Sequence, residues 1–185
     1  MNTIVFDLET QNTFDEAGGQ EKLDKLGVSA VGVYLYTKNE YICYTDKDKS
    51  ELLKLFGEKC ILIGFSSTKL DIPLLSYFLD IDIFPYPRID ISDEIEIRTG
   101  RLIKLDDLAK LNLGISKTGK AIDAPRLYKE GKIEELKEYC LQDVKITKEL
   151  YEKIKSDGSI LIPSRDSEKI SERVEINLSR QAVVW

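Results

Sequence analysis

The strongest constraint on the fold is a nearly continuous apolar run near the start of the chain, Thr-Ile-Val-Phe-Asp-Leu at residues 3–8. Such a run is typical of a central strand that is buried on both faces. Residues 60–64 form a second run of this kind. Strands buried on both faces occur mainly in α/β proteins, where helices cover the two sides of the sheet. The chain is therefore expected to adopt an α/β fold.

Other segments predict how strands and helices follow one another. Residues 11–26 are polar, which indicates a loop. Residues 27–37 and 40–44 are rich in β-branched and aromatic residues, so they predict a hairpin turning at Lys38-Asn39. Helices are expected at residues 47–57, 72–79, 104–113 and 132–156, and short strands at 88–91, 160–162 and 173–178. The order indicates a mixed sheet flanked by helices.

The length and composition fit one cytoplasmic domain spanning residues 1–185, with a β-rich C-terminal extension over residues 158–185. No apolar run approaches the roughly 20 residues of a membrane span. The first residues include an early acid and no basic segment, so neither a signal peptide nor a membrane partner is expected. Cys43, Cys60 and Cys140 contain no C-x-x-C pair, which favours reduced thiols.

The sequence contains no histidine. This excludes Ser-His triads and histidine-containing zinc sites. Any metal must be held by oxygen ligands, which favours Mg²⁺ or Mn²⁺. The net charge of −6 argues against a general nucleic-acid coat protein, which would usually be basic. It does not argue against a nuclease, because divalent cations offset the charge of a carboxylate cluster.

Two acids interrupt the first apolar run. Asp7 and Glu9 are two positions apart on the expected strand, so their side chains share one face. Burying unpaired charges is costly, and a bound cation would account for them. The alternative is that the strand ends at Phe6 and that both acids lie in solvent.

A third acid falls within the apolar stripe of the long helix expected at residues 132–156. At about 100° per residue, the stripe consists of Ile133, Leu136, Cys140, Val144, Thr147, Leu150 and Ile154. Asp143 lies inside this stripe, and Tyr139 lies one turn before it on the same face. An ion pair with Lys or Arg, or a side chain reaching solvent at the margin, would also explain Asp143.

A fourth acid, Asp71, follows a strand and a loop and precedes a helix that contains Pro73. By itself Asp71 is better explained as an ordinary helix N-cap.

Taken together, the three segments resemble the motifs of the DEDD 3′–5′ exonuclease superfamily, whose fold is ribonuclease H-like. Val5 to Thr10 is similar to the first motif, D-x-E followed by Thr, and Gly64-Phe65 through Asp71 is similar to the second. Tyr139-x-x-x-Asp143 matches the tyrosine-containing third motif. Proofreading domains of family B DNA polymerases and helicase-associated ribonuclease H-like domains are the nearest resemblances.

The resemblance implies a two-metal-ion site for hydrolysis of phosphodiester bonds. Its ligands would be the carboxylates of Asp7, Glu9, Asp71 and Asp143, holding two Mg²⁺ or Mn²⁺ ions. A phenol has a pKa near 10, so Tyr139 is expected to orient the attacking water rather than remove its proton. The implied partner is the 3′ end of single-stranded DNA or RNA, with a helicase or polymerase in trans as a further partner.

The expected substrate contacts are Thr10, Phe65, Ser66, Lys117 and Lys120. Phe65 would stack on a terminal base, or belong to the core beside strand 60–64. Ser66 stands where the family usually has Asn, and Leu70 where it usually has an aromatic residue; both departures concern substrate positioning more than metal binding. A basic patch formed by Lys117, Lys120, Arg126, Lys129 and Lys132 would follow a phosphate backbone, or be a solvated surface of mixed charge with Asp123 and Glu130.

Three other functional classes compete with an exonuclease. Residues 114–121 match the start of a P-loop, but Ala121 replaces the required Ser or Thr, and a helix is expected before them instead of a strand. A structural accessory domain, related to part of a larger helicase or polymerase, would have to find helicase or polymerase motifs in trans, because this sequence has none. A ribonuclease H-like module that binds nucleic acid or a partner without cutting would be expected to lose a carboxylate or the tyrosine. All five are present, which favours an enzyme.

Overall fold

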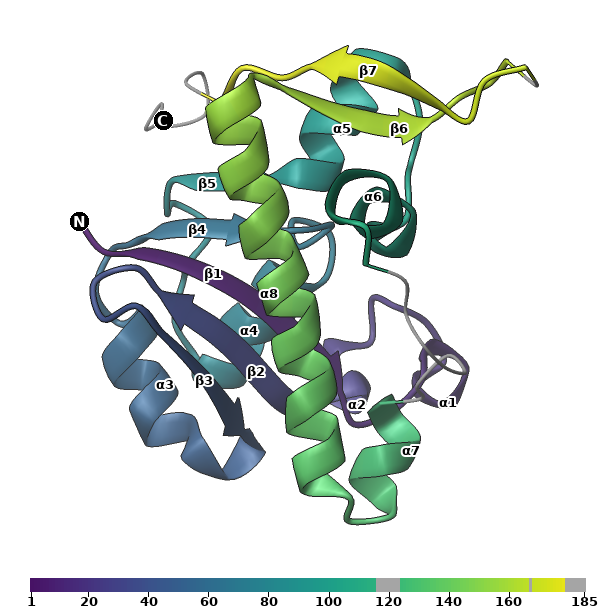
Figure 1. Ribbon diagram of the computed structural model, residues 1–185. Coiled ribbons are helices and arrows are strands. Elements are labelled where there is room, and N and C mark those ends of the chain that lie inside the picture. The colour runs from purple at the N-terminus through teal and green to yellow at the C-terminus, as the bar shows by residue number, and fades with distance from the viewer. Residues whose placement is uncertain (116–123, 167, 179–185) are drawn as a thin grey trace.

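The computed structural model describes residues 1–115, 124–166 and 168–178. A five-stranded sheet in the order β3-β2-β1-β4-β5 forms its centre (Figure 1). The middle strand is β1 (Thr3–Thr10), which pairs antiparallel with β2 (Val28–Leu35) and parallel with β4 (Ile61–Gly64). β3 (Glu40–Thr45) and β5 (Arg88–Asp90) form the two edges. The mixed sheet, its buried strands and the predicted hairpin are confirmed.

The alternation of side chains along β1 divides the molecule into two layers. Ile4, Phe6 and Leu8 face a core that contains residues of α3 (Lys49–Phe56) and α4 (Asp71–Leu79). Val5 lies on the opposite face and packs with Val144 of α8 (Ile133–Asp157), the long helix that crosses the sheet in Figure 1. Successive strand residues point to opposite faces, so Asp7 and Glu9 lie on the α8 side.

Most helices lie within a residue or two of their predicted positions, and four elements were missed. The segment predicted as a loop contains α1 (Phe14–Ala17) and α2 (Leu23–Leu26). α1 begins with a capping box, in which Thr13 and Glu16 satisfy each other's backbone N–H groups. The other two missed helices are α5 (Ile91–Thr99) and α7 (Ala124–Lys129). A short 3₁₀ turn, Asp46–Asp48, precedes α3.

A second, two-stranded sheet covers the C-terminal half of α8. It pairs β6 (Ser159–Pro163) with β7 (Ser171–Glu175), so the second strand begins two residues earlier than predicted. Ile160, Ile162 and Ile176 join a core cluster with residues of α5, α6 (Leu105–Leu113) and α8. Over the described ranges, the structure contains no helix of the length and apolarity that a membrane span requires.

Candidate metal centre

Asp7 and Glu9 are held inside a paired strand and not at its frayed end. β1 continues to Thr10, and Asp7 and Glu9 lie opposite Gly32 and Ala30 of β2. Both acids are half-buried. The alternative in which the strand ends at Phe6, with both acids in solvent, is therefore wrong. The strand becomes irregular only between Glu9 and Thr10.

Helix α8 approaches this pair of acids very closely because β2 carries a glycine at the contact. A Cβ atom at Gly32 would lie 2.9 Å from both Cys140 Sγ and Val144 Cγ2. The Gly32 amide donates a hydrogen bond to Cys140 Sγ at 3.1 Å. The Cys140 thiol in turn donates to Asp7, 3.7 Å from the backbone oxygen and 3.8 Å from Oδ2. One ligand atom each from Asp7, Glu9 and Cys140 lies within 4.8 Å of the others.

The thiol of Cys140 stays protonated in these surroundings. A hydrogen bond with Cys43, burial and the nearby charge of Asp7 raise the pKa of Cys140 well above its usual value. A protonated thiol is a weak metal ligand, because the thiolate is the form that binds metal. Oxygen ligands therefore dominate this cluster.

Asp143 and Tyr139 are carried to the same region by α8. Asp143 is only 8% exposed, so its side chain does not reach solvent at the margin of the stripe. Asp143 lies three residues after Cys140, and Cys140 contacts Asp7. Tyr139 lies one helical turn before Asp143. Tyr139 is half-buried and packs against the core cluster that contains Leu136 and Cys140.

Asp71 is the fourth predicted acid, and α4 carries it toward Asp7 of β1. It is the first residue of α4, whose N-cap is Leu70, so the alternative that Asp71 caps the helix is wrong. The side chain is buried. Burial, and the neighbouring charges of Asp7 and Asp90, raise the pKa of Asp71 well above its ordinary value. Since the charge of Asp7 contributes to raising the pKa of Asp71, the acids from β1 and α4 form one electrostatic cluster.

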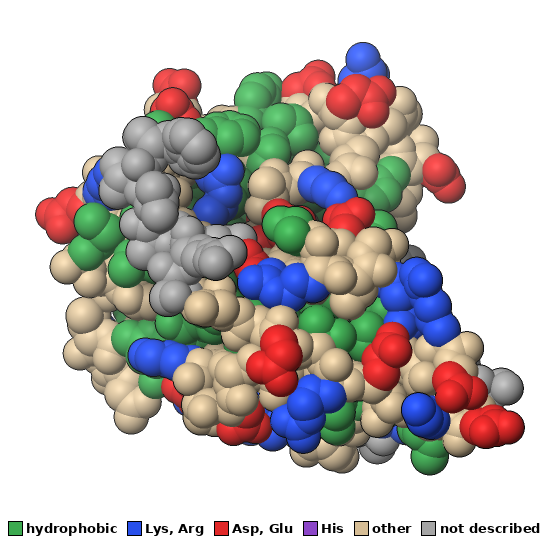
Figure 2. Space-filling view, turned by 90° about the horizontal axis from the view of Figure 1, so that it is seen from above, with side chains coloured by type: hydrophobic (Ala, Val, Ile, Leu, Met, Phe, Trp, Pro, Cys, Tyr) green, Lys and Arg blue, Asp and Glu red, His purple; other side chains and the backbone are tan. Residues whose placement is uncertain are grey.

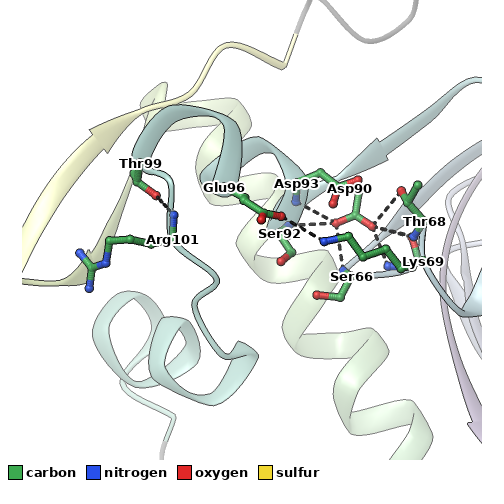
Figure 3. A network of polar contacts seen from close by, with 10 residues as sticks. Ser66, Thr68, Lys69, Asp90, Ser92, Asp93, Glu96, Thr99 and Arg101 are labelled. Carbon is green, nitrogen blue, oxygen red and sulfur yellow. Dashed lines mark hydrogen bonds and ion pairs between the residues drawn. The ribbon is translucent and has the colours of Figure 1, made fainter. Parts of the chain in front are cut away.

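Asp90, at the end of β5, is an important residue that the sequence analysis missed (Figure 3). Its side chain is 2% exposed and fixes the loop between β4 and Asp71. Oδ1 accepts hydrogen bonds from the backbone N–H of Ser66, at 2.9 Å, and of Ser92 and Asp93 in α5. Oδ2 accepts from the backbone N–H and hydroxyl groups of Ser67 and Thr68. No helix was predicted after Asp90, so no sequence signal pointed to this N-cap role.

The expected substrate contacts are found in different environments. Ser66 is exposed at the edge of the loop that Asp90 holds. Phe65 is half-buried and packs against the core cluster beneath α5 and α6. The Thr10 hydroxyl donates a hydrogen bond to the Asn12 carbonyl at 2.8 Å. Lys117 and Lys120 lie outside the described residues, and so does Asp123.

The described part of the basic patch carries mixed charge. Lys129 pairs with Glu16 at 2.6 Å, while Arg126 and Lys132 both pair with Glu130. Acidic and basic side chains are also interspersed on the face seen in Figure 2. For these three cations the solvated, mixed-charge interpretation agrees with the structure. The helix expected before the P-loop-like segment is present as α6, which excludes the strand that a P-loop requires.

Ser66 has a backbone conformation that leads to a prediction. Its φ is +56°, in the left-handed region, where Asn is much better tolerated than Ser. Its side chain is exposed, so an amide has room. Ser66→Asn is therefore expected to raise the free energy of unfolding by up to about 1 kcal/mol, measured by urea denaturation. Ser66→Ala is the matched control, because it keeps the strained backbone. Equal effects of the two substitutions would contradict this explanation.

Comparison with known proteins identifies the fold. No family model matches the sequence, and no curated protein matches it. Among solved structures, a zinc-bound complex of E. coli exonuclease I with single-stranded DNA matches with a TM-score of 0.54 and 13% identity, over 84% of this chain and 40% of that one. Brucella melitensis NrnC bound to pGG matches with a TM-score of 0.55 and 14% identity, over 84% and 74% of the two chains. E. coli exonuclease I with a dA16 oligonucleotide gives 0.53 and 12%, over 84% and 41%.

The chain has the α/β ribonuclease H-like fold predicted from its sequence, and it shares that fold with exonuclease I and NrnC. It spans about two fifths of the exonuclease I chains and about three quarters of NrnC.

Proposed function

We propose that this protein is a metal-dependent 3′–5′ exonuclease that hydrolyses the phosphodiester bonds of single-stranded nucleic acid. The observation that carries the proposal is the gathering of carboxylates from β1 and α4. Asp143 of α8 lies one helical turn from Cys140, which contacts Asp7. Buried like charges are costly, and bound cations would offset that cost. The fold shared with E. coli exonuclease I supports the same function.

The donor atoms suit two hard divalent cations, Mg²⁺ or Mn²⁺. Asp7, Glu9, Asp71 and Asp143 supply carboxylate oxygens, the ligands that these ions prefer. When bound, the ions would stabilise the attacking and leaving oxygens of an in-line phosphoryl displacement. The protein's own contribution is to hold the four carboxylates in place, on the rigid elements β1, α4 and α8.

Tyr139 is proposed to orient the attacking water. Its position one turn before Asp143 puts both side chains on the same face of α8. The proposed contacts to the 3′-terminal nucleotides are Thr10, Phe65 and Ser66. Lys117 and Lys120 are proposed to contact the phosphate backbone of the same nucleic-acid strand.

Tyr139→Phe is expected to lower kcat by about 10- to 100-fold, as loss of a supporting polar group around a metal site commonly does. Metal affinity should stay the same, since no ligand is removed. Exonuclease rates and Mn²⁺ titration calorimetry measure the two quantities separately. Unchanged activity would show that the hydroxyl has no role in orienting water.

The proposed function is tested with 3′- and 5′-labelled single-stranded DNA and RNA, incubated with Mg²⁺ or Mn²⁺. We expect stepwise loss of nucleotides from the 3′ end, abolished by a chelator and by Asp7→Ala. The same assay decides between DNA and RNA. If no substrate loses 3′ nucleotides but the labelled strands still bind, the protein is a non-catalytic binding module.

A further inference from the structure

We propose that Cys43 and Cys140 are a modification site, at which oxidation forms a disulfide that disables the adjoining acidic centre. The formation of the bond depends only on the positions of the two thiols. Its inhibitory effect rests on the proposed exonuclease function.

The sheet brings the two sulfurs together over a glycine. Cys43 of β3 is the direct partner of Gly32 in the antiparallel register of β2. Directly opposed residues point to the same face of a sheet, so Cys43 and the missing side chain of Gly32 face α8 together. Cys140 Sγ fills the space above Gly32, 2.9 Å from where its Cβ would lie. Cys43 accordingly packs against the cluster that contains Cys140.

The two thiols differ in their access to an oxidant. Cys43 is half-buried, whereas Cys140 has no exposed surface. A small peroxide therefore meets Cys43 first. The Cys43 sulfur takes one oxygen from hydrogen peroxide, which gives a sulfenic acid and one water. The Cys140 sulfur then displaces the hydroxyl group, which leaves as a second water with the Cys140 proton. Two thiols and one peroxide give one disulfide and two waters.

The new bond would disturb the acidic centre because Cys140 is already in contact with it. Its thiol donates to Asp7 O and Oδ2, and its neighbours on α8 are Tyr139 and, one turn on, Asp143. A disulfide removes the thiol hydrogen and draws the sulfur toward β3. Asp7 then loses a hydrogen-bond donor, and the turn of α8 that carries two proposed site residues must shift.

The third cysteine provides a matched control. Cys60 is as fully buried as Cys140, but it belongs to the core cluster on the opposite face of the sheet, with residues of α3 and α4. Cys60→Ser should therefore leave both the disulfide and its effect unchanged.

The experiment treats the full chain with hydrogen peroxide and compares it with dithiothreitol-reduced protein. Non-reducing peptide mass mapping should find Cys43 joined to Cys140, with Cys60 free. Exonuclease activity should fall at least tenfold and recover after reduction. Cys43→Ser should be resistant to inhibition, and Cys43→Ala repeats the test if the serine variant folds poorly.

The two arms separate the disulfide from the proposed function. If Cys43 and Cys140 remain uncrosslinked, the proposed disulfide is overturned, whether or not the exonuclease activity changes. If the crosslink forms and activity is unchanged, or if Cys43→Ser is inhibited like the wild type, the inhibitory effect is overturned. If the reduced protein shows no exonuclease activity, the function fails, and the peptide map still decides whether the disulfide forms.

Discussion

Asp71→Asn is expected to reduce exonuclease activity by more than about 100-fold while making the metal-free protein more stable. The activity loss should exceed the range of about 10–100-fold typical of residues that only support a metal ligand, because Asp71 is a proposed ligand. The stability gain follows from burial and from the charges of Asp7 and Asp90, which raise the pKa of Asp71. A neutral amide of the same shape removes this repulsion.

The pH dependence of stability provides a second measurement of the same effect. The carboxyl of an unfolded chain has a pKa near 3.9. Because the folded-state pKa of Asp71 is raised, the native state holds the proton more tightly between pH of about 4 and that raised value. The free energy of unfolding contributed by Asp71 is thus present at low pH and is lost as pH rises through this window. Asp71→Asn should flatten that decline.

Urea denaturation in a chelator, over a series of pH values, measures both effects. Added Mn²⁺ should stabilise the wild type more than Asp71→Asn. Asp80→Asn is the matched control, since Asp80 lies exposed at the other end of α4 in the left-handed conformation that Asn also tolerates. A metal-free Asp71→Asn protein less stable than wild type would contradict the electrostatic explanation.

Asp90→Ala is expected to lower the free energy of unfolding by about 3 kcal/mol or more. The substitution removes the N-cap of α5 and leaves the backbone N–H groups of Ser66, Ser67 and Thr68 without their acceptor. Those three residues form the loop that leads to Asp71, so metal affinity should fall as well. Chemical denaturation and Mn²⁺ titration calorimetry measure the two losses.

Asp90→Asn separates the two roles of the carboxylate. Its remaining oxygen can still cap α5 and accept from Ser66, as Oδ1 does now. An NH₂ group in place of Oδ2 would face the donors of Ser67 and Thr68. We therefore expect a smaller loss of stability than in Asp90→Ala, with metal affinity still impaired. Wild-type metal affinity in both variants would show that the loop does not position Asp71.

Much of the fold could be predicted because its strands and longest helix carry strong local patterns. The apolar run at residues 3–8 and the β-branched hairpin segments became β1, β2 and β3, and the stripe around Leu136 became the buried face of α8. Three of the missed helices, α1, α2 and α7, have only four to six residues, which give too little periodicity. α1 depends on a local capping box, and α5 on an Asp90 side chain that also serves another loop.

The candidate site was only partly visible in the sequence. The helical position of Asp143 and the strand spacing of Asp7 and Glu9 are local properties, and both acids of the strand do lie on the α8 side. The contact between Gly32 and Cys140 joins residues 108 positions apart, and the hydrogen bond from Ser66 to Asp90 spans 24 positions. Such contacts depend on tertiary packing, which no local pattern contains. The assignment of ligands therefore stays a prediction for the experiments above.

The length of α8 has a consequence for how the protein opens. Its first half carries Tyr139 and Asp143 against the sheet, and its second half buries Ile146, Leu150 and Ile154 beneath β6 and β7. A helix that contributes to two cores cannot fray from its C-terminal end without exposing apolar surface. Amide hydrogens along α8 should therefore exchange with solvent only in rare openings that also release the β6–β7 hairpin. The small β6–β7 hairpin would thus govern how long the turn of α8 that carries Tyr139 and Asp143 stays folded.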